Sequence, residues 1–126
     1  MPMNTPLACV LFAGVMPLLG AATAKWGFKG FDNHQPRAWL AEQSGLRARA
    51  NAAQLNSFEA FPFFAVAVLL ALHFQADSAW LDTLCLMFVA ARVLYFVAYL
   101  MDWASFRTLC WVVGYGACIA IYLPLL

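Results

Sequence analysis

Charged residues are scarce in this sequence. They make up 10% of its 126 residues, whereas hydrophobic residues make up 65% and the mean hydropathy is +0.77. A soluble domain carries about 25% charged residues, so this chain lacks the polar side chains needed to cover a globule of its size. The net charge of +1 argues against the basic surface of a nucleic-acid-binding protein. The composition therefore predicts an integral membrane protein.

Patterns typical of metal sites and disulfides are also missing. The four cysteines all fall in apolar stretches, and no two of them form a C-x-x-C motif. The two histidines, His34 and His73, lie far apart with no cysteine or acid pattern near them. We therefore expect no metal site and no disulfide framework, and we expect the cysteines to act as small buried hydrophobes.

Four long apolar stretches are present instead, at residues 5–24, 58–74, 79–101 and 108–126. A helix needs about 20 residues to cross the hydrocarbon core of a bilayer. The helical pattern of the second stretch extends back to about residue 45, and a helix over 45–74 would be ~45 Å long. We expect Pro17 to bend the first helix. The sequence predicts an all-α fold, a four-transmembrane-helix bundle in which residues 1–126 form one domain.

The connections between these stretches differ in length. Residues 25–44 form the one long connection, and the links at 75–78 and 102–107 are short. Short links make consecutive helices antiparallel neighbours. The start of the second span, the end of the third and the start of the fourth should therefore meet at the same side of the membrane.

Ionisable residues interrupt two of the apolar stretches at that side. Glu59 lies in the second span and Arg92 in the third. Because a charge inside a bilayer is costly, it is normally retained for a function or held by a partner. Arg49 and Asn56 share the helix face of Glu59, at a spacing of seven and then three residues.

The third and fourth spans add further polar groups at the same depth. Tyr95 and Tyr99 follow Arg92 at a spacing of three and then four residues, which places all three on one face. Arg107 lies at the start of the fourth span. We interpret these groups as one polar pocket, although an Arg92–Glu59 salt bridge and an interfacial tyrosine belt are structural alternatives.

Such a pocket suits a small zwitterion with excess negative charge, held beside an apolar co-substrate. Arginine binds carboxylates through two parallel hydrogen bonds, and Glu59 could receive an ammonium group. Arg107 adds its charge to the positive end of the fourth helix. Together they would lower the pKa of a nearby thiol and so favour the nucleophilic thiolate.

These segments resemble those of a known family. Residues 56–62 read N-S-F-E-A-F-P, and residues 91–100 read A-R-V-L-Y-F-V-A-Y-L, followed by Arg107. They are similar to the MAPEG family, the membrane-associated proteins of eicosanoid and glutathione metabolism. The segments D-N-H-Q-P-R at 32–37 and R-A-R-A-N-A-A-Q-L-N at 47–56 resemble the bacterial branch of that family.

The resemblance implies a homotrimer in the bacterial inner membrane that binds glutathione as co-substrate between subunits. It also implies a transferase or peroxidase acting on small lipophilic electrophiles or lipid hydroperoxides. The implied glutathione-binding residues are Arg49, Asn56, Glu59 and Arg92, and we add Tyr95 because it shares the helix face of Arg92. The implied catalytic residues are Arg107, which would stabilise the thiolate, and Tyr99, which would assist it.

A second hypothesis is a non-catalytic membrane module that uses the same pocket for another anion or a lipid headgroup. Catalytic members of the family usually carry an arginine four residues before the asparagine and often a histidine two residues before it. This chain has Ala52 and Gln54 at those positions. The two substitutions favour the second hypothesis.

The distribution of cations predicts the orientation of the bundle. Six cations lie at the ends of the spans that face the first and third connections, and they are Lys25, Lys29, Arg37, Arg47, Arg49 and Arg107. The opposite ends carry Asp77 and Asp82 instead. Because cytoplasmic loops are enriched in lysine and arginine, we predict that residues 25–44 are cytoplasmic and that both termini are outside. Tags placed at Met1 and Leu126 should be reachable only from outside in sealed vesicles, and cytoplasmic labelling of both would reverse this assignment.

Overall fold

Four long helices form the bundle, and all four are long and apolar enough to cross a membrane. The computed structural model describes residues 3–27 and 30–126. The long helices are α1 (Thr5–Lys25), α3 (Gly45–His73), α4 (Ser78–Leu100) and α5 (Ala104–Tyr122). A 3₁₀ turn, η1 (Leu123–Leu125), follows α5. The predicted all-α bundle of four transmembrane helices is confirmed, while Met1 and Lys29 lie outside the described residues.

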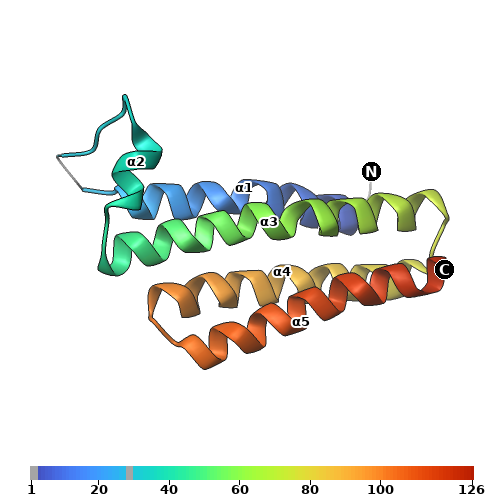
Figure 1. Cartoon of the computed structure of the whole chain (residues 1–126). Helices are drawn as coiled ribbons and strands as arrows, with labels where there is room; N and C mark the ends of the chain where they lie inside the picture. Colours follow the sequence, from blue (N-terminus) through green and yellow to red (C-terminus); the bar gives the residue numbers. More distant parts are fainter. Residues whose placement is uncertain (1–2, 28–29) are drawn as a thin grey trace.

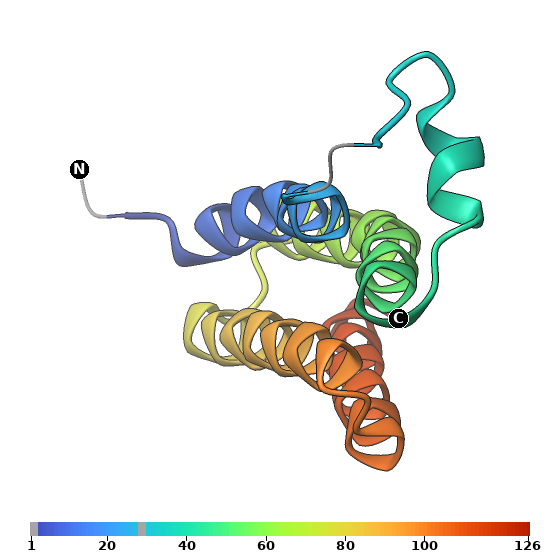
Figure 2. The same cartoon turned by 90° about the vertical axis from the view of Figure 1, so that its left-hand side faces the viewer.

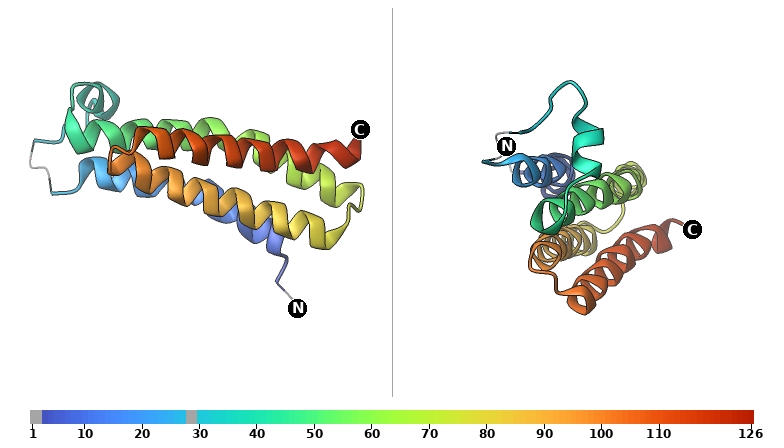
Figure 3. Two further views of the ribbon diagram at one scale, coloured as in Figure 1. Left: turned by 90° about the horizontal axis from the view of Figure 1, so that it is seen from below. Right: turned by 60° about the vertical axis from the view of Figure 1, so that its left-hand side comes forward.

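The helices are arranged as two pairs. α1 packs along α3 and α4 packs along α5, and α3 also contacts both α4 and α5 (Figure 1). The end-on view shows the two pairs side by side (Figure 2). The start of α1 and the end of α5 lie at the end of the bundle away from α2 (Figure 3). The second span therefore occupies the position from which it can share a site with the third and the fourth.

The two short turns end their helices in the same way. Gln75 and Asp102 adopt left-handed backbone conformations, with φ of 54° and 59°. The backbone N–H of the following residue then donates a hydrogen bond to a carbonyl oxygen near the end of the helix. Ala76 N donates to Ala71 O at 2.9 Å, and Trp103 N donates to Ala98 O at 2.8 Å. This is the Schellman arrangement, which satisfies carbonyls that a helix end would leave unpaired. Both short links predicted from the sequence are confirmed.

Two features differ from the sequence-based expectation: the long connection contains a helix, and the fourth span begins earlier. The long connection contains a short helix, α2 (Pro36–Ala41), which begins at a proline whose fixed φ suits the first helical turn. Its Leu40 is buried against Ala24 and Ala50, which gives α2 an apolar anchor. The fourth helix begins at Ala104 rather than near residue 108, so Arg107 lies inside its first turn. α1 continues through Pro17, which is buried.

Close packing of α1 on α3 depends on Gly20. A β-carbon at this position would lie 2.9 Å from Cβ of Gln54 and 3.2 Å from the carbonyl oxygen of Ala50. The second contact is with helix backbone, which cannot move aside without shifting α3. Glycine therefore sets the distance between these two helices.

We predict that Gly20→Ala lowers the stability of the protein in detergent by about 1–3 kcal/mol, the usual cost of overpacking a filled site. The matched control is Gly116→Ala, because a β-carbon on Gly116 meets nothing within 4 Å and alanine favours helix more than glycine does. Thermal unfolding followed by circular dichroism measures both variants. Equal midpoints for the two variants would contradict this account of the α1–α3 contact.

Candidate functional site

Arg92 is the buried charge around which the candidate site is built. It lies on α4 with only 4% of its surface exposed. Its Nη1 donates to Oδ1 of Asn56 at 2.8 Å, and its Nη2 donates to Oγ of Ser57 at 3.4 Å. Ser57 in turn donates to the carbonyl oxygen of Ala53 at 2.8 Å. A side chain on α4 is thus held by two neighbouring residues on α3.

Asn56 connects Arg92 to Glu59. The Nδ2 of Asn56 donates to Oε2 of Glu59 at 3.3 Å, while its Oδ1 accepts from Arg92. Glu59 is exposed on the bundle surface and Asn56 is half-buried. Among the hydrogen bonds and ion pairs of the described residues there is no direct Arg92–Glu59 contact within the chain; the amide of Asn56 bridges the two charges instead. A salt bridge between subunits, the other form of this alternative, stays a prediction.

These three residues line one cavity between α3, α4 and α5. Its volume is about 240 Å³. Beside Asn56, Glu59 and Arg92, it is lined by mostly apolar and aromatic residues, namely Ala60, Phe63, Phe88, Trp111, Tyr115 and Cys118. The cavity therefore combines a polar wall that carries both signs of charge, formed by Asn56, Glu59 and Arg92, with an aromatic wall suited to apolar groups.

The aromatic wall is a stack of rings that sequence reasoning missed. Tyr115 stacks on Phe63 with ring centroids 5.1 Å apart and on Trp111 with centroids 5.1 Å apart. Phe63 also stacks on Tyr122, at 5.0 Å. Trp111, Tyr115 and Cys118 are spaced by four and then three residues, which places them on one face of α5. That spacing is the signal that could have identified this face of α5 from the sequence.

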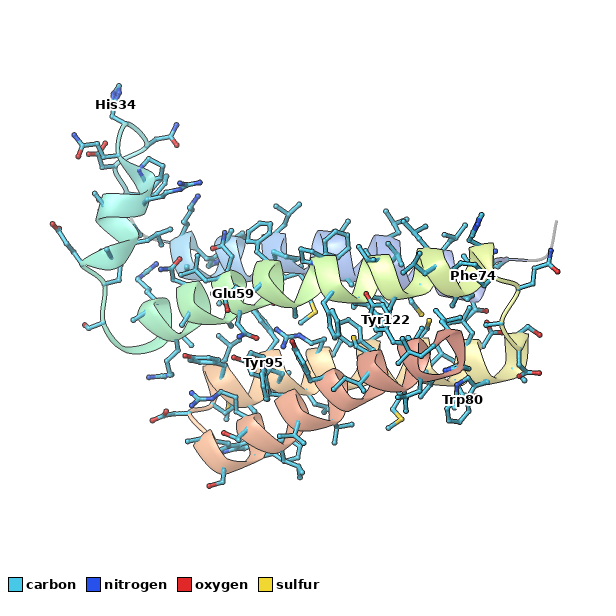
Figure 4. The ribbon with its side chains drawn as sticks, turned by 45° about the vertical axis from the view of Figure 1, so that its right-hand side comes forward. His34, Glu59, Phe74, Trp80, Tyr95 and Tyr122 are labelled. Carbon is cyan, nitrogen blue, oxygen red and sulfur yellow. The ribbon has the colours of Figure 1, made fainter. Side chains whose placement is uncertain are left out.

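Tyr95, Tyr99 and Arg107 lie beside the cavity without lining it. The guanidinium carbon of Arg92 is 4.2 Å from the ring centroid of Tyr95, and that of Arg107 is 4.3 Å from the ring centroid of Tyr99. The two tyrosine rings meet edge to face at 5.6 Å. Arg92 therefore belongs both to the cavity and to a row of cation–π contacts. Glu59 and Tyr95 lie toward the α2 end of the bundle, whereas Tyr122 and Trp80 lie toward the other end (Figure 4).

Arg49 and Gln54 lie apart from this cavity. The Nε of Arg49 donates to the carbonyl oxygen of Leu100 at 3.3 Å, so it ties the start of α3 to the end of α4. Gln54 lines a separate cavity of about 500 Å³ together with Arg37 and Asn51. Its Oε1 is buried and has no hydrogen-bond partner within the described part of the chain. Of the predicted site residues, Asn56, Glu59 and Arg92 line the cavity, Tyr95, Tyr99 and Arg107 lie beside it, and Arg49 lies apart from it.

We predict that Asn56→Leu lowers the stability of the protein in detergent by about 1.5–3 kcal/mol. The substitution removes the 2.8 Å acceptor of a buried guanidinium, and hydrogen bonds to charged groups contribute about that much. The matched control is Asn51→Leu, which changes the same residue type on another face of α3. Thermal unfolding midpoints test the difference, and equal midpoints for the two variants would refute the role given to Asn56.

Comparison with known proteins agrees with this architecture. The family model described as the MAPEG family matches residues 5–126, which includes all four long helices and every residue of the cavity. No curated protein and no solved structure gives a significant match. This chain, an integral membrane protein with four spanning helices, belongs to the MAPEG family.

Proposed function

We propose that the protein is an integral membrane glutathione-dependent transferase or peroxidase that acts on lipophilic electrophiles or lipid hydroperoxides. The observation that carries this proposal is the composition of one cavity: Arg92, Asn56 and Glu59 form its hydrogen-bonded polar wall, and stacked aromatic rings form its apolar wall. Family membership supports a glutathione-related role. The two walls provide for a charged thiol compound and an apolar co-substrate in the same space.

Glutathione carries two carboxylates and one ammonium group, and the charges of the cavity complement them. Arg92 is held by the neutral acceptors Asn56 and Ser57, so its positive charge is available to a carboxylate. Glu59 is exposed and can receive the ammonium group. Arg49, at the start of α3, adds a further cation toward the α2 end of the bundle.

Arg107 and Tyr99 are the proposed catalytic pair. The row Arg92–Tyr95–Tyr99–Arg107 leads from the cavity to the first turn of α5, where the helix end is positive. A tripeptide lying along this row can place its thiol near Arg107, and the nearby cation favours the thiolate. The Tyr99 hydroxyl can then donate a hydrogen bond to the sulfur.

Both proposed reactions begin from the thiolate. With an electrophile, its sulfur forms a bond to carbon as the leaving group departs with the bonding electrons. With a hydroperoxide, the sulfur bonds to the distal oxygen to give the sulfenic acid as the O–O bond breaks. The departing alkoxide takes up the proton that the glutathione thiol lost on ionisation and leaves as the alcohol. A second glutathione then converts the sulfenic acid into the disulfide and water.

The assembly and its orientation belong to the same proposal. Glu59 is exposed at membrane depth, and a charge facing lipid is costly. A neighbouring subunit that covers this face removes that cost, which supports an oligomer, and the number of three subunits is proposed from family membership alone. Five cations lie in or beside the α2 end of the bundle, namely Lys25, Arg37, Arg47, Arg49 and Arg107. Their position supports a cytoplasmic site and outward termini in a bacterial inner membrane.

We predict that glutathione binds the detergent-purified protein saturably and raises the ultraviolet absorbance of the thiolate. Arg107→Ala should abolish the rise in absorbance and weaken binding by about tenfold, or ~1.4 kcal/mol. Arg37→Ala removes the same charge from α2 and serves as the control. Titration calorimetry measures binding, and difference spectroscopy measures the thiolate.

The absence of saturable binding at millimolar glutathione would refute the proposal. It would favour the non-catalytic module, in which the cavity holds another anion or a lipid headgroup. Two observations already favour that alternative: Ala52 and Gln54 replace the residues usual in catalytic members, and Arg107 and Tyr99 do not line the cavity. If the protein is such a non-catalytic module, Glu59→Gln should lower the stability of the oligomer, and neither the wild type nor the variant should have glutathione-dependent enzymatic activity.

A further inference from the structure

A second hollow of the bundle shares no residue with the candidate site. It is a groove of about 710 Å³ formed by the end of α1, the start of α3 and one residue of α4. Its lining residues are Leu19, Ala22, Thr23, Trp26, Ser44, Leu46, Arg47 and Phe96. We refer to these eight residues as the α1–α3–α4 groove.

The groove runs from the membrane surface into the hydrocarbon region. Trp26 follows the last residue of α1 and is 81% exposed, and tryptophan at the end of a membrane span typically lies at the headgroup level. Leu19 is seven residues earlier on the same helix, which corresponds to about 10 Å at ~1.5 Å per residue. The groove is therefore deep enough to accept the first part of an acyl chain.

The polar and apolar groups of the groove are separated along this depth. Its deeper part is formed by Leu19 and Phe96. Leu19 is exposed on the bundle surface, where it would contact lipid acyl chains. Ser44 and Arg47 lie at the start of α3 and form its shallow part. Among the described residues that line the groove, Arg47 is the one with a charged side chain, and it lies at the shallow end.

Arg47 is held in position at this mouth. Its Nη1 donates to the carbonyl oxygen of Ala24 in the last turn of α1, at 3.0 Å. A cation at the C-terminal end of a helix is favoured by the helix dipole, so the bond also stabilises α1. The result is a guanidinium whose place at the groove is set by both helices.

We propose that the α1–α3–α4 groove binds one anionic phospholipid, with its phosphate at Ser44 and Arg47 and an acyl chain along Leu19 and Phe96. Guanidinium groups bind phosphate oxygens in a fork-like geometry, and anionic lipids are attracted to cations next to membrane spans. A soluble phosphate would leave the apolar, deeper part of the groove at Leu19 and Phe96 without a ligand. This site is independent of the glutathione site, because the two share no residue.

The test is native mass spectrometry of the detergent-purified protein, titrated with phosphatidylglycerol or with phosphatidylcholine of the same acyl chains. The wild type should retain phosphatidylglycerol more strongly. Arg47→Gln should lower the affinity for phosphatidylglycerol by about fivefold, the change expected for ~1 kcal/mol per cation near a lipid surface, and should leave phosphatidylcholine binding unchanged. Arg37→Gln makes the same charge change outside the groove and should have no effect.

Two further variants distinguish the contribution of charge to lipid binding from that of the fold and from that of the apolar, deeper part of the groove. Arg47→Lys keeps the positive charge, so it should preserve the preference for phosphatidylglycerol even if the bond to Ala24 is weakened. Phe96→Ala should weaken the binding of both lipids, whereas Phe74→Ala, at the opposite end of α3, should not. Thermal midpoints recorded alongside show whether each variant remains folded.

Three outcomes would overturn the proposal. Equal retention of the two lipids by the wild type would show that the charge of the headgroup does not determine which lipid binds. Binding of inorganic phosphate as strong as that of phosphatidylglycerol would make the groove a site for a soluble anion. Loss of lipid binding in the oligomer, together with disulfide cross-linking of Leu46→Cys between copies, would show that a second copy of the chain covers the groove.

Discussion

The buried guanidinium of Arg92 sets the packing of α3 against α4. A charge at this depth is tolerated in a membrane protein only where the protein itself solvates it. Here the solvation comes from the amide oxygen of Asn56, the hydroxyl of Ser57 and the ring face of Tyr95. Because Asn56 and Ser57 are on α3 whereas Arg92 is on α4, these two hydrogen bonds favour the observed placement of the two helices.

The chemistry of those partners also determines what the cavity can bind. Asn56, Ser57 and Tyr95 are neutral, so they orient the guanidinium without cancelling its charge. Glu59, the nearest acid in this network, is reached only through the amide of Asn56. The two opposite charges therefore remain separated on one wall, which is the arrangement that a zwitterionic ligand requires. A direct salt bridge would have left a neutral pair and a weaker anion site.

Much of this arrangement was predictable from local patterns. The four spans follow from the length of apolar runs, and the two short links follow from polar interruptions between them. The common depth of Asn56, Glu59 and Arg92 follows from antiparallel connectivity together with helical spacing. The short helix α2 was not predicted, because six residues at Pro36–Ala41 are too few to display a period, and its stability comes from the burial of Leu40 against other helices.

The sequence alone determined the membrane environment, the number of spans and the side of the bundle at which polar groups gather, because hydropathy and helical period are properties of single segments. The tertiary structure decided which of those groups meet. It brought Phe63 and the aromatic face of α5 to the cavity, placed Tyr99 and Arg107 beside it, and inserted Asn56 between the two charges. These outcomes depend on the rotation of each helix about its own axis, which is set by packing between helices.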